Sequence, residues 1–178
     1  MVRAFKLSWI SLILLGFTPV SHAAFETKLS EIHLQSVLQG YFPISEYAAF
    51  ARVTLNEPAV KLEKGSKDIS LIIPMDAKLA GNDIRQGHVT IFVSLSYKHT
   101  TGGVYLDNPR IQQLVIPGVS EKLKADLRGI VEAMATNSLP LVRIYKVKEK
   151  DLNHSLAKSA LKAFDIDDAH LRLEFGFK

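Results

Sequence analysis

The chain of 178 residues contains no cysteine. This absence excludes disulfide bonds, thiol nucleophiles, thiolate metal sites and the acylated cysteine that tethers bacterial lipoproteins. Long apolar runs are also scarce. The run from Leu7 to Phe17 is shorter than the roughly 20 residues that a spanning helix needs, and no later stretch approaches even that length. We therefore expect no transmembrane anchor.

The same apolar run is the centre of a three-part N-terminal pattern. Arg3 and Lys6 precede it, and Ser21-His22-Ala23 follows it with small residues at two positions. A basic start, an apolar centre and a small-residue cleavage site are the order of a secretory signal peptide. The sequence therefore predicts a signal peptide over residues 1–23 and a single exported domain of 155 residues over residues 24–178.

The predicted mature chain has no strong excess of positive or negative charge. Without Arg3 and Lys6, 20 basic residues face 18 acidic ones. Lysine and arginine do not cluster among aromatic residues, whereas a nucleic-acid-binding surface must neutralise several phosphates. We expect no nucleic-acid partner.

Known catalytic signatures are absent too, among them the nucleophile elbow, the phosphate loop, the dinucleotide loop and the zincin helix. The histidines of the predicted domain are single and widely separated, which does not favour a metal site: His33, His88, His99, His154 and His170. We expect no catalytic residue, no metal and no cofactor. An enzyme with an unrecognised site is one of three functional alternatives, beside the two non-enzymatic ones given below. A cleft that holds coupled titratable groups would favour it.

The only dense acidic group consists of Asp165, Asp167 and Asp168. A calcium ion favours several carboxylate oxygens close together, but three aspartates are too few, and neither a glycine kink nor a glutamate follows at loop spacing. The group is typical of a polar turn next to the final strand or helix.

Alternation of apolar and polar residues predicts strands in the middle of the chain. Residues 69–79 and 89–97 carry apolar side chains at every second position, and Gly81-Asn82-Asp83 supplies a turn between them. A reversal at Thr101-Gly102-Gly103 leads into a further strand at 104–107. Weaker strand signals lie at 48–55 and 59–62. Strands joined by short turns form an antiparallel meander.

Helical periodicity flanks this meander on both sides. Residues 29–39 form a first helix with Ser30 as N-cap and with Ile32, Val37 and Leu38 toward the core. The longest helix is predicted over 119–137. A strand at 139–147, a short helix near 152–163 and a closing strand at 170–177 complete an α+β fold.

The strands and the long helix carry more apolar surface than a small core needs. One explanation is a second small core covered by the terminal elements. The other is a groove between sheet and helix that accepts an apolar ligand, because small-molecule sites are mostly apolar. The candidate ligand contacts are Leu71, Ile73, Val93, Leu95, Leu123, Leu127, Ile130 and Met134.

Short apolar and aromatic blocks carry a resemblance to a known family. They are Glu31-Ile32, Leu38-Gln39-Gly40-Tyr41-Phe42-Pro43-Ile44, Leu95-Ser96-Tyr97, Gly103-Val104-Tyr105-Leu106-Asp107, Leu139-Pro140 and Ile144-Tyr145-Lys146-Val147. With these blocks the chain, from about residue 27 to 175, resembles the DUF1439 family. The resemblance implies a periplasmic protein of a Gram-negative envelope. It also implies a curved antiparallel sheet wrapped along a long helix, similar to the tubular lipid-binding (TULIP-like) superfamily.

The family includes a lipoprotein, but this chain lacks the cysteine for acylation. We therefore expect a periplasmic protein that is not a lipoprotein. The leading functional hypothesis is non-enzymatic binding of a lipid or other apolar molecule between sheet and long helix. The alternative is a structural or interaction module of the envelope, with a closed core and an envelope protein as its partner.

Overall fold

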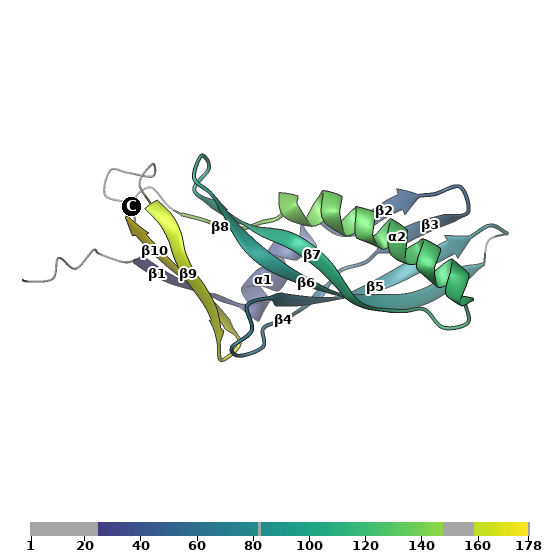
Figure 1. The fold of residues 1–178 in the computed structure, drawn as a ribbon, viewed down its shortest axis with the longest axis horizontal. Helices are drawn as coiled ribbons and strands as arrows, with labels where there is room; N and C mark the ends of the chain where they lie inside the picture. Colours follow the sequence, from purple (N-terminus) through teal and green to yellow (C-terminus); the bar gives the residue numbers. More distant parts are fainter. Residues whose placement is uncertain (1–24, 82, 148–158, 178) are drawn as a thin grey trace, which may run out of the picture.

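The computed structural model describes residues 25–81, 83–147 and 159–177, which form two antiparallel sheets and two α-helices (Figure 1). The helices are α1 (Glu31–Gln39) and α2 (Glu121–Ser138), and a 3₁₀ turn, η1, spans Leu139–Leu141. The strands are β1 (Phe25–Ser30), β2 (Ile44–Tyr47), β3 (Ala51–Leu55), β4 (Ala59–Lys61), β5 (Ile69–Leu79), β6 (Ile84–Lys98), β7 (Gly103–Val115), β8 (Arg143–Lys146), β9 (Ser159–Asp167) and β10 (His170–Phe177).

The larger sheet has the strand order β2-β3-β5-β6-β7-β8, and β4 pairs with β5 beside this path. Successive side chains of a strand point to opposite faces of the sheet. Leu71, Ile73 and Val93 are therefore fully buried on the inner face, while Ile72 is exposed on the outer face. The sheet is strongly curled, and α2 lies along its length (Figure 1). This is an α+β fold of TULIP-like arrangement, which confirms the expected fold class.

Local signals in the sequence define α2. Ser120 is the N-cap, and its hydroxyl oxygen accepts a hydrogen bond from the backbone N–H of Leu123 at 3.3 Å. One stripe of the helix is buried against the sheet and contains Leu127, Val131 and Met134. Burial of this stripe stabilises the helix more than propensity does, because an isolated helix of this length is marginal in water.

The smaller sheet has the order β1-β10-β9 and lies at the end of the molecule that holds the C-terminus (Figure 1). Phe175 of β10 is only 1% exposed. Its ring centroid lies 5.5 Å from that of Phe25, 5.7 Å from that of Tyr97 and 5.9 Å from that of Tyr145. Phe25 belongs to the smaller sheet, whereas Tyr97 and Tyr145 belong to the larger one. These four rings, which we call the aromatic junction, therefore join the two sheets.

Several predicted elements match the structure closely. The strands at 69–79 and 170–177 have the predicted bounds, and the predicted helix over 119–137 is α2. Ser30 is the N-cap of α1, and the backbone N–H of His33 donates to its hydroxyl oxygen at 3.2 Å. The expectation for Ile32 is wrong, because this side chain is 82% exposed. At 100° per residue it lies on the side of α1 opposite the buried Leu34 and Leu38.

The helix predicted near 152–163 is wrong for residues 159–163, which belong to β9. Pairing with β10 over the length of β9 overrides the local helical pattern there. Residues 152–158 lie outside the described part of the chain. The strand predicted at 139–147 is shorter than expected, since η1 occupies its first three residues and β8 covers Arg143–Lys146.

Neither helix is both long enough and apolar enough to cross a membrane, as judged over the residues that the structure describes. The predicted signal peptide, residues 1–23, lies outside those residues.

Candidate functional site

A groove separates α2 from the edge strand β2. Its volume is about 450 Å³, within the range of about 300–1,000 Å³ of small-molecule sites. Its walls come from β2 and the residue after it on one side and from about three turns of α2 on the other. The lining residues are Glu46, Tyr47, Ala48, Asp126, Gly129, Ile130, Ala133, Met134 and Asn137. We call this space the α2–β2 groove.

The α2–β2 groove exists because α2 carries small side chains where it faces β2. Gly129 and Ala133 are one helical turn apart, and a Cβ atom added at Gly129 would meet no atom within 4 Å. Ile130 and Met134 form the apolar floor, of which Met134 is 3% exposed. Glycine inside a helix lowers stability by about 1 kcal/mol relative to alanine. Gly129 therefore destabilises α2 at a position where its missing side chain leaves room for the groove.

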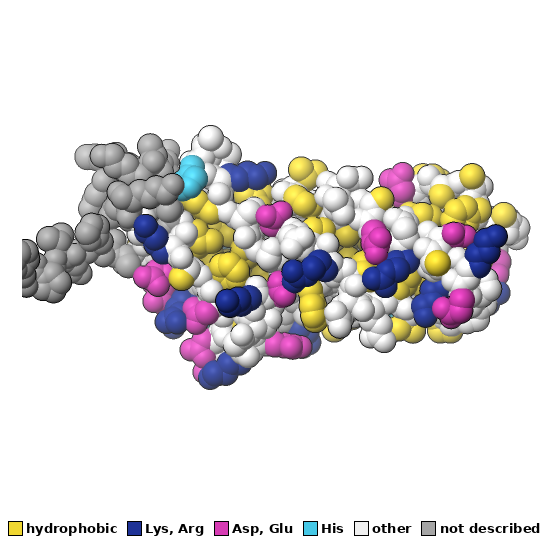
Figure 2. All heavy atoms as spheres, viewed as in Figure 1, with side chains coloured by type: hydrophobic (Ala, Val, Ile, Leu, Met, Phe, Trp, Pro, Cys, Tyr) yellow, Lys and Arg dark blue, Asp and Glu magenta, His cyan; other side chains and the backbone are white. Residues whose placement is uncertain are grey.

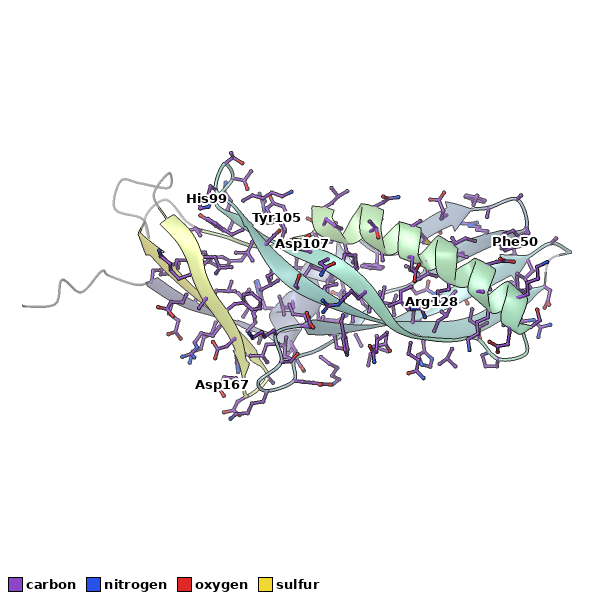
Figure 3. The ribbon with its side chains drawn as sticks, in the orientation of Figure 1. Phe50, His99, Tyr105, Asp107, Arg128 and Asp167 are labelled. Carbon is purple, nitrogen blue, oxygen red and sulfur yellow. The ribbon has the colours of Figure 1, made fainter. Side chains whose placement is uncertain are left out.

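The opposite side of α2 faces β7, and there Arg128 forms two hydrogen bonds. Its Nε donates to Glu132 Oε1 at 3.1 Å, one turn along the helix, and its terminal nitrogen donates to the backbone carbonyl of Ile111 at 3.0 Å. Arg128 is labelled in Figure 3. Hydrogen bonds from charged groups are stronger than those between neutral groups. The helix is therefore held to β7 by a charged hydrogen bond and faces β2 across the α2–β2 groove.

The eight predicted ligand contacts all belong to the apolar core between sheet and helix or pack against it. Leu71, Ile73, Val93 and Leu127 are 0% exposed, so they are packed against other side chains. Leu95, Leu123 and Ile130 are partly buried, and Met134 is nearly buried. Of these eight residues, only Ile130 and Met134 line the α2–β2 groove.

Sequence reasoning missed Tyr47, Ala48, Gly129 and Ala133 as lining residues. Gly129 was the available signal, because an isolated glycine inside an amphipathic helical pattern calls for a packing or functional reason. Tyr47 carried no signal, because β2 has only four residues and its burial does not alternate. Ala48 was predicted only as the start of a strand.

The three aspartates of the dense acidic group lie at the β9–β10 turn and form ion pairs. Asp165 accepts two hydrogen bonds from Arg172, at 2.8 and 2.7 Å, and these bonds lower the pKa of the Asp165 carboxyl. Lys64 Nζ lies 3.2 Å from Asp167 and 3.1 Å from Asp168, and its hydrogen bonds with both raise its pKa. The interpretation as a polar turn is confirmed.

Histidines and carboxylates do not gather into a metal-binding group of three or more anywhere in the described residues. His33, His88, His99 and His170 are all exposed, and His154 lies outside the described residues. His99 and Tyr105 belong to the β6–β7 hairpin (Figure 3). A hydrogen bond with Thr101 lowers the pKa of Tyr105, whose ring also faces the Lys98 ammonium at 4.4 Å.

A family model described as "Protein of unknown function (DUF1439)" matches residues 29–169. The chain belongs to the DUF1439 family. The DUF1439 match includes β2 and α2, so both walls of the α2–β2 groove lie within it. No curated protein matches the chain.

Proposed function

We propose that this DUF1439 protein is a non-enzymatic, extracytoplasmic binding protein for a lipid or another apolar molecule, held between the curled sheet and α2. The observation that carries the proposal is the α2–β2 groove, because two of its lining residues are in contact with the apolar interior: Met134 belongs to the core and Ile130 packs against it. The ligand would enter between the helix and the edge strand, where Ile130 and Met134 are the first predicted contacts it meets.

The composition of the interior supports an apolar ligand. The buried side chains of the described residues are aliphatic and aromatic, with Ser70 as the one buried polar residue among them. Apolar ligands are bound by such surfaces because burial removes their hydrocarbon from water. Glu46 and Asp126, at the groove walls, are both exposed and would remain in water beside a bound chain.

A long ligand can reach the buried predicted contacts only if α2 moves. Leu71, Ile73, Val93 and Leu127 have no exposed surface, so a ligand reaches them only when the helix separates from β2. An acyl chain of about 14 methylenes gains roughly 11 kcal/mol on leaving water, at about 0.8 kcal/mol each. A bilayer offers a similar gain. Occupancy therefore depends on how well the opened groove competes with a membrane, which suits a protein that carries a lipid and releases it.

The closed packing of those four core residues favours a second candidate function, a protein-interaction module of the envelope. In that case the groove is a surface depression, and the exposed edge of β2 pairs with a strand of another protein.

Mass spectrometry of an organic extract distinguishes the two functions. The protein, expressed from its full sequence and purified without detergent, is expected to contain close to one lipid or other apolar molecule per chain. Ala133→Trp fills the groove and is expected to lower that content at least tenfold. Ala125→Trp, at an exposed position of α2 that does not line the groove, is the matched control and should retain the ligand.

Circular dichroism establishes that both variants remain folded. An empty wild-type protein would favour the interaction module. Equal ligand content in the Ala133→Trp and Ala125→Trp variants would exclude the α2–β2 groove as the site.

A further inference from the structure

Two hairpins end side by side at the end of the molecule remote from the C-terminus (Figure 1). The β2–β3 hairpin places Tyr47 and Phe50 there, and the β5–β6 hairpin adds Ile84. These side chains are 69%, 39% and 57% exposed, respectively. Figure 2 shows hydrophobic side chains gathered at this end, with charged groups beside them, and Figure 3 labels Phe50 at its edge. We call residues 47–52, 78–81 and 83–84 the hairpin tip.

Backbone hydrogen bonds connect the described loop residues of the hairpin tip. Ala48 and Ala51 exchange two backbone hydrogen bonds, at 2.8 and 3.3 Å, around the loop residues Ala49 and Phe50. The N–H of Ala80 donates to the carbonyl of Phe50 at 3.2 Å and links the two hairpins. Tight turns usually contain Gly, Asn, Asp, Pro or Ser. Alanine and phenylalanine therefore have no evident role in forming this turn.

Behind the loops, one row of residues crosses four strands. The register pairs Tyr47 with Arg52, Arg52 with Lys78, and Lys78 with Ile84. All four side chains are fully or partly exposed on the outer face, and the Arg52 guanidinium lies 5.0 Å from the centre of the Tyr47 ring. Like charges that lie directly opposite each other destabilise a sheet. The Arg52–Lys78 pair is therefore a cost that an anionic partner would remove.

The next row toward the centre of the sheet is polar. Ser45 and Thr54 share a hydrogen bond of 2.9 Å, and Gln86 donates to Asp76 at 3.3 Å. Along the outer face, the order from the tip inward is thus apolar loops, then aromatic and basic side chains, then hydroxyl, amide and carboxylate groups. Aromatic belts and basic residues occupy the same intermediate depth where proteins meet a bilayer.

Acidic groups also lie near the hairpin tip. Asp83 pairs with Arg85 at 2.7 Å. Asp76 accepts hydrogen bonds from the neutral amides of Asn56, at 2.8 Å, and Gln86, and it lines a hollow of about 420 Å³ together with Arg52 and Lys78. Glu46 is one residue from Tyr47 along β2 and lines the α2–β2 groove. A hollow of about 340 Å³ at the tip is lined by Arg52, Lys78 and apolar or aromatic residues from 47 to 51 and 79 to 80, with no carboxylate among its described lining residues.

We propose that the hairpin tip docks on the surface of an anionic lipid bilayer. Phe50 reaches the boundary of the acyl chains, Tyr47 and Ile84 lie at headgroup depth, and Arg52 and Lys78 bind headgroup phosphate oxygens. Attraction of a basic side chain to an anionic membrane surface acts within about a Debye length, so the row of cations must touch the headgroups. This docking is independent of whether the α2–β2 groove holds a ligand.

Flotation with vesicles tests the proposal on the intact protein. We expect binding to vesicles of phosphatidylcholine with about 30% phosphatidylglycerol, weaker binding to pure phosphatidylcholine, and loss of binding at 1 M salt, where the Debye length is about 3 Å. The double variant Arg52→Gln/Lys78→Gln should lower the partition constant about 30-fold, at about a fivefold contribution for each cation. Phe50→Ser should also weaken binding.

Matched controls lie elsewhere on the surface. Lys61→Gln removes an exposed cation of β4, and Ile32→Ser removes an exposed apolar side chain of α1; neither should change partition. Equal binding to neutral and anionic vesicles, no binding, or an unchanged partition of the double variant would overturn the proposal. So would a dimer in analytical ultracentrifugation that Phe50→Ser dissociates, because the tip would then be a contact between two copies of the chain.

Discussion

Replacing Phe175 with alanine tests whether the aromatic junction holds the smaller sheet against the larger one. The ring is 1% exposed and has three aromatic neighbours within 6 Å between centroids, from both sheets. A Phe→Ala substitution in a packed core costs about 3–5 kcal/mol, of which each aromatic pair contributes about 0.5–1.5 kcal/mol. Phe175→Ala should therefore lower the free energy of unfolding by about 4 kcal/mol.

Thermal and urea unfolding measure this change. For a protein of this size each kcal/mol shifts the Tm by about 2–4 °C, so we expect a decrease of roughly 8–16 °C. Phe50→Ala removes the same side chain from the exposed hairpin tip and should change stability by only about 0.5 kcal/mol. A cost below about 1 kcal/mol for Phe175→Ala would refute the packing argument. A second, earlier transition in urea would show that the smaller sheet unfolds separately.

Three further predictions concern the N-terminus, one ion pair and two glycines. Protein recovered from the periplasm of a Gram-negative host should begin at Ala24, as determined by N-terminal sequencing; retention of residues 1–23 would contradict the signal-peptide prediction. Asp165→Asn should lower the Tm at pH 7, because Arg172 depresses the Asp165 pKa and thereby stabilises the fold above the unfolded pKa of about 3.9. The difference from wild type should vanish as the pH falls below that value and through the depressed pKa, and a difference that persists in acid would contradict the assignment. Gly129→Ala should raise the Tm by about 2–4 °C, since the added Cβ meets open space in a helix. Gly87→Ala should lower stability by about 1–3 kcal/mol, because its Cβ would clash with the backbone oxygen of Val115 in β7; a Gly87→Ala variant as stable as wild type would contradict this statement.

The fold was predictable where one face of an element is buried along its whole length. The bounds of β5 and β10 follow from alternation, because every second side chain of these strands packs inside. The short strands β1 and β2 were not predicted. β1 pairs with β10, more than a hundred residues away, and β2 has only four residues at a sheet edge. Long-range pairing explains why β1 shows little local pattern, whereas β2 is too short to show alternation.

Two lining residues of the α2–β2 groove were predictable from the periodicity of apolar residues in α2. Apolar periodicity identifies which residues of α2 face the sheet, and so it included Ile130 and Met134. It does not distinguish a side chain packed against a neighbour from one that borders a groove, and Leu71 and Leu127 are of the first kind. That distinction depends on where the edge strand β2 ends relative to α2, which only the three-dimensional arrangement fixes.

The pairing of β1 with β10 also has a consequence for the order of folding. The first described strand and the last one are direct neighbours, in register from Phe25–Phe175 to Ser30–His170. A chain that emerges N-terminus first, from a ribosome or across a membrane, holds β1 without its partner until β10 has arrived, more than a hundred residues later. The larger sheet and α2 can pair earlier, since their strands are mostly neighbours in sequence. The smaller sheet therefore closes after the larger one, and it closes only once β10 has been synthesised or delivered.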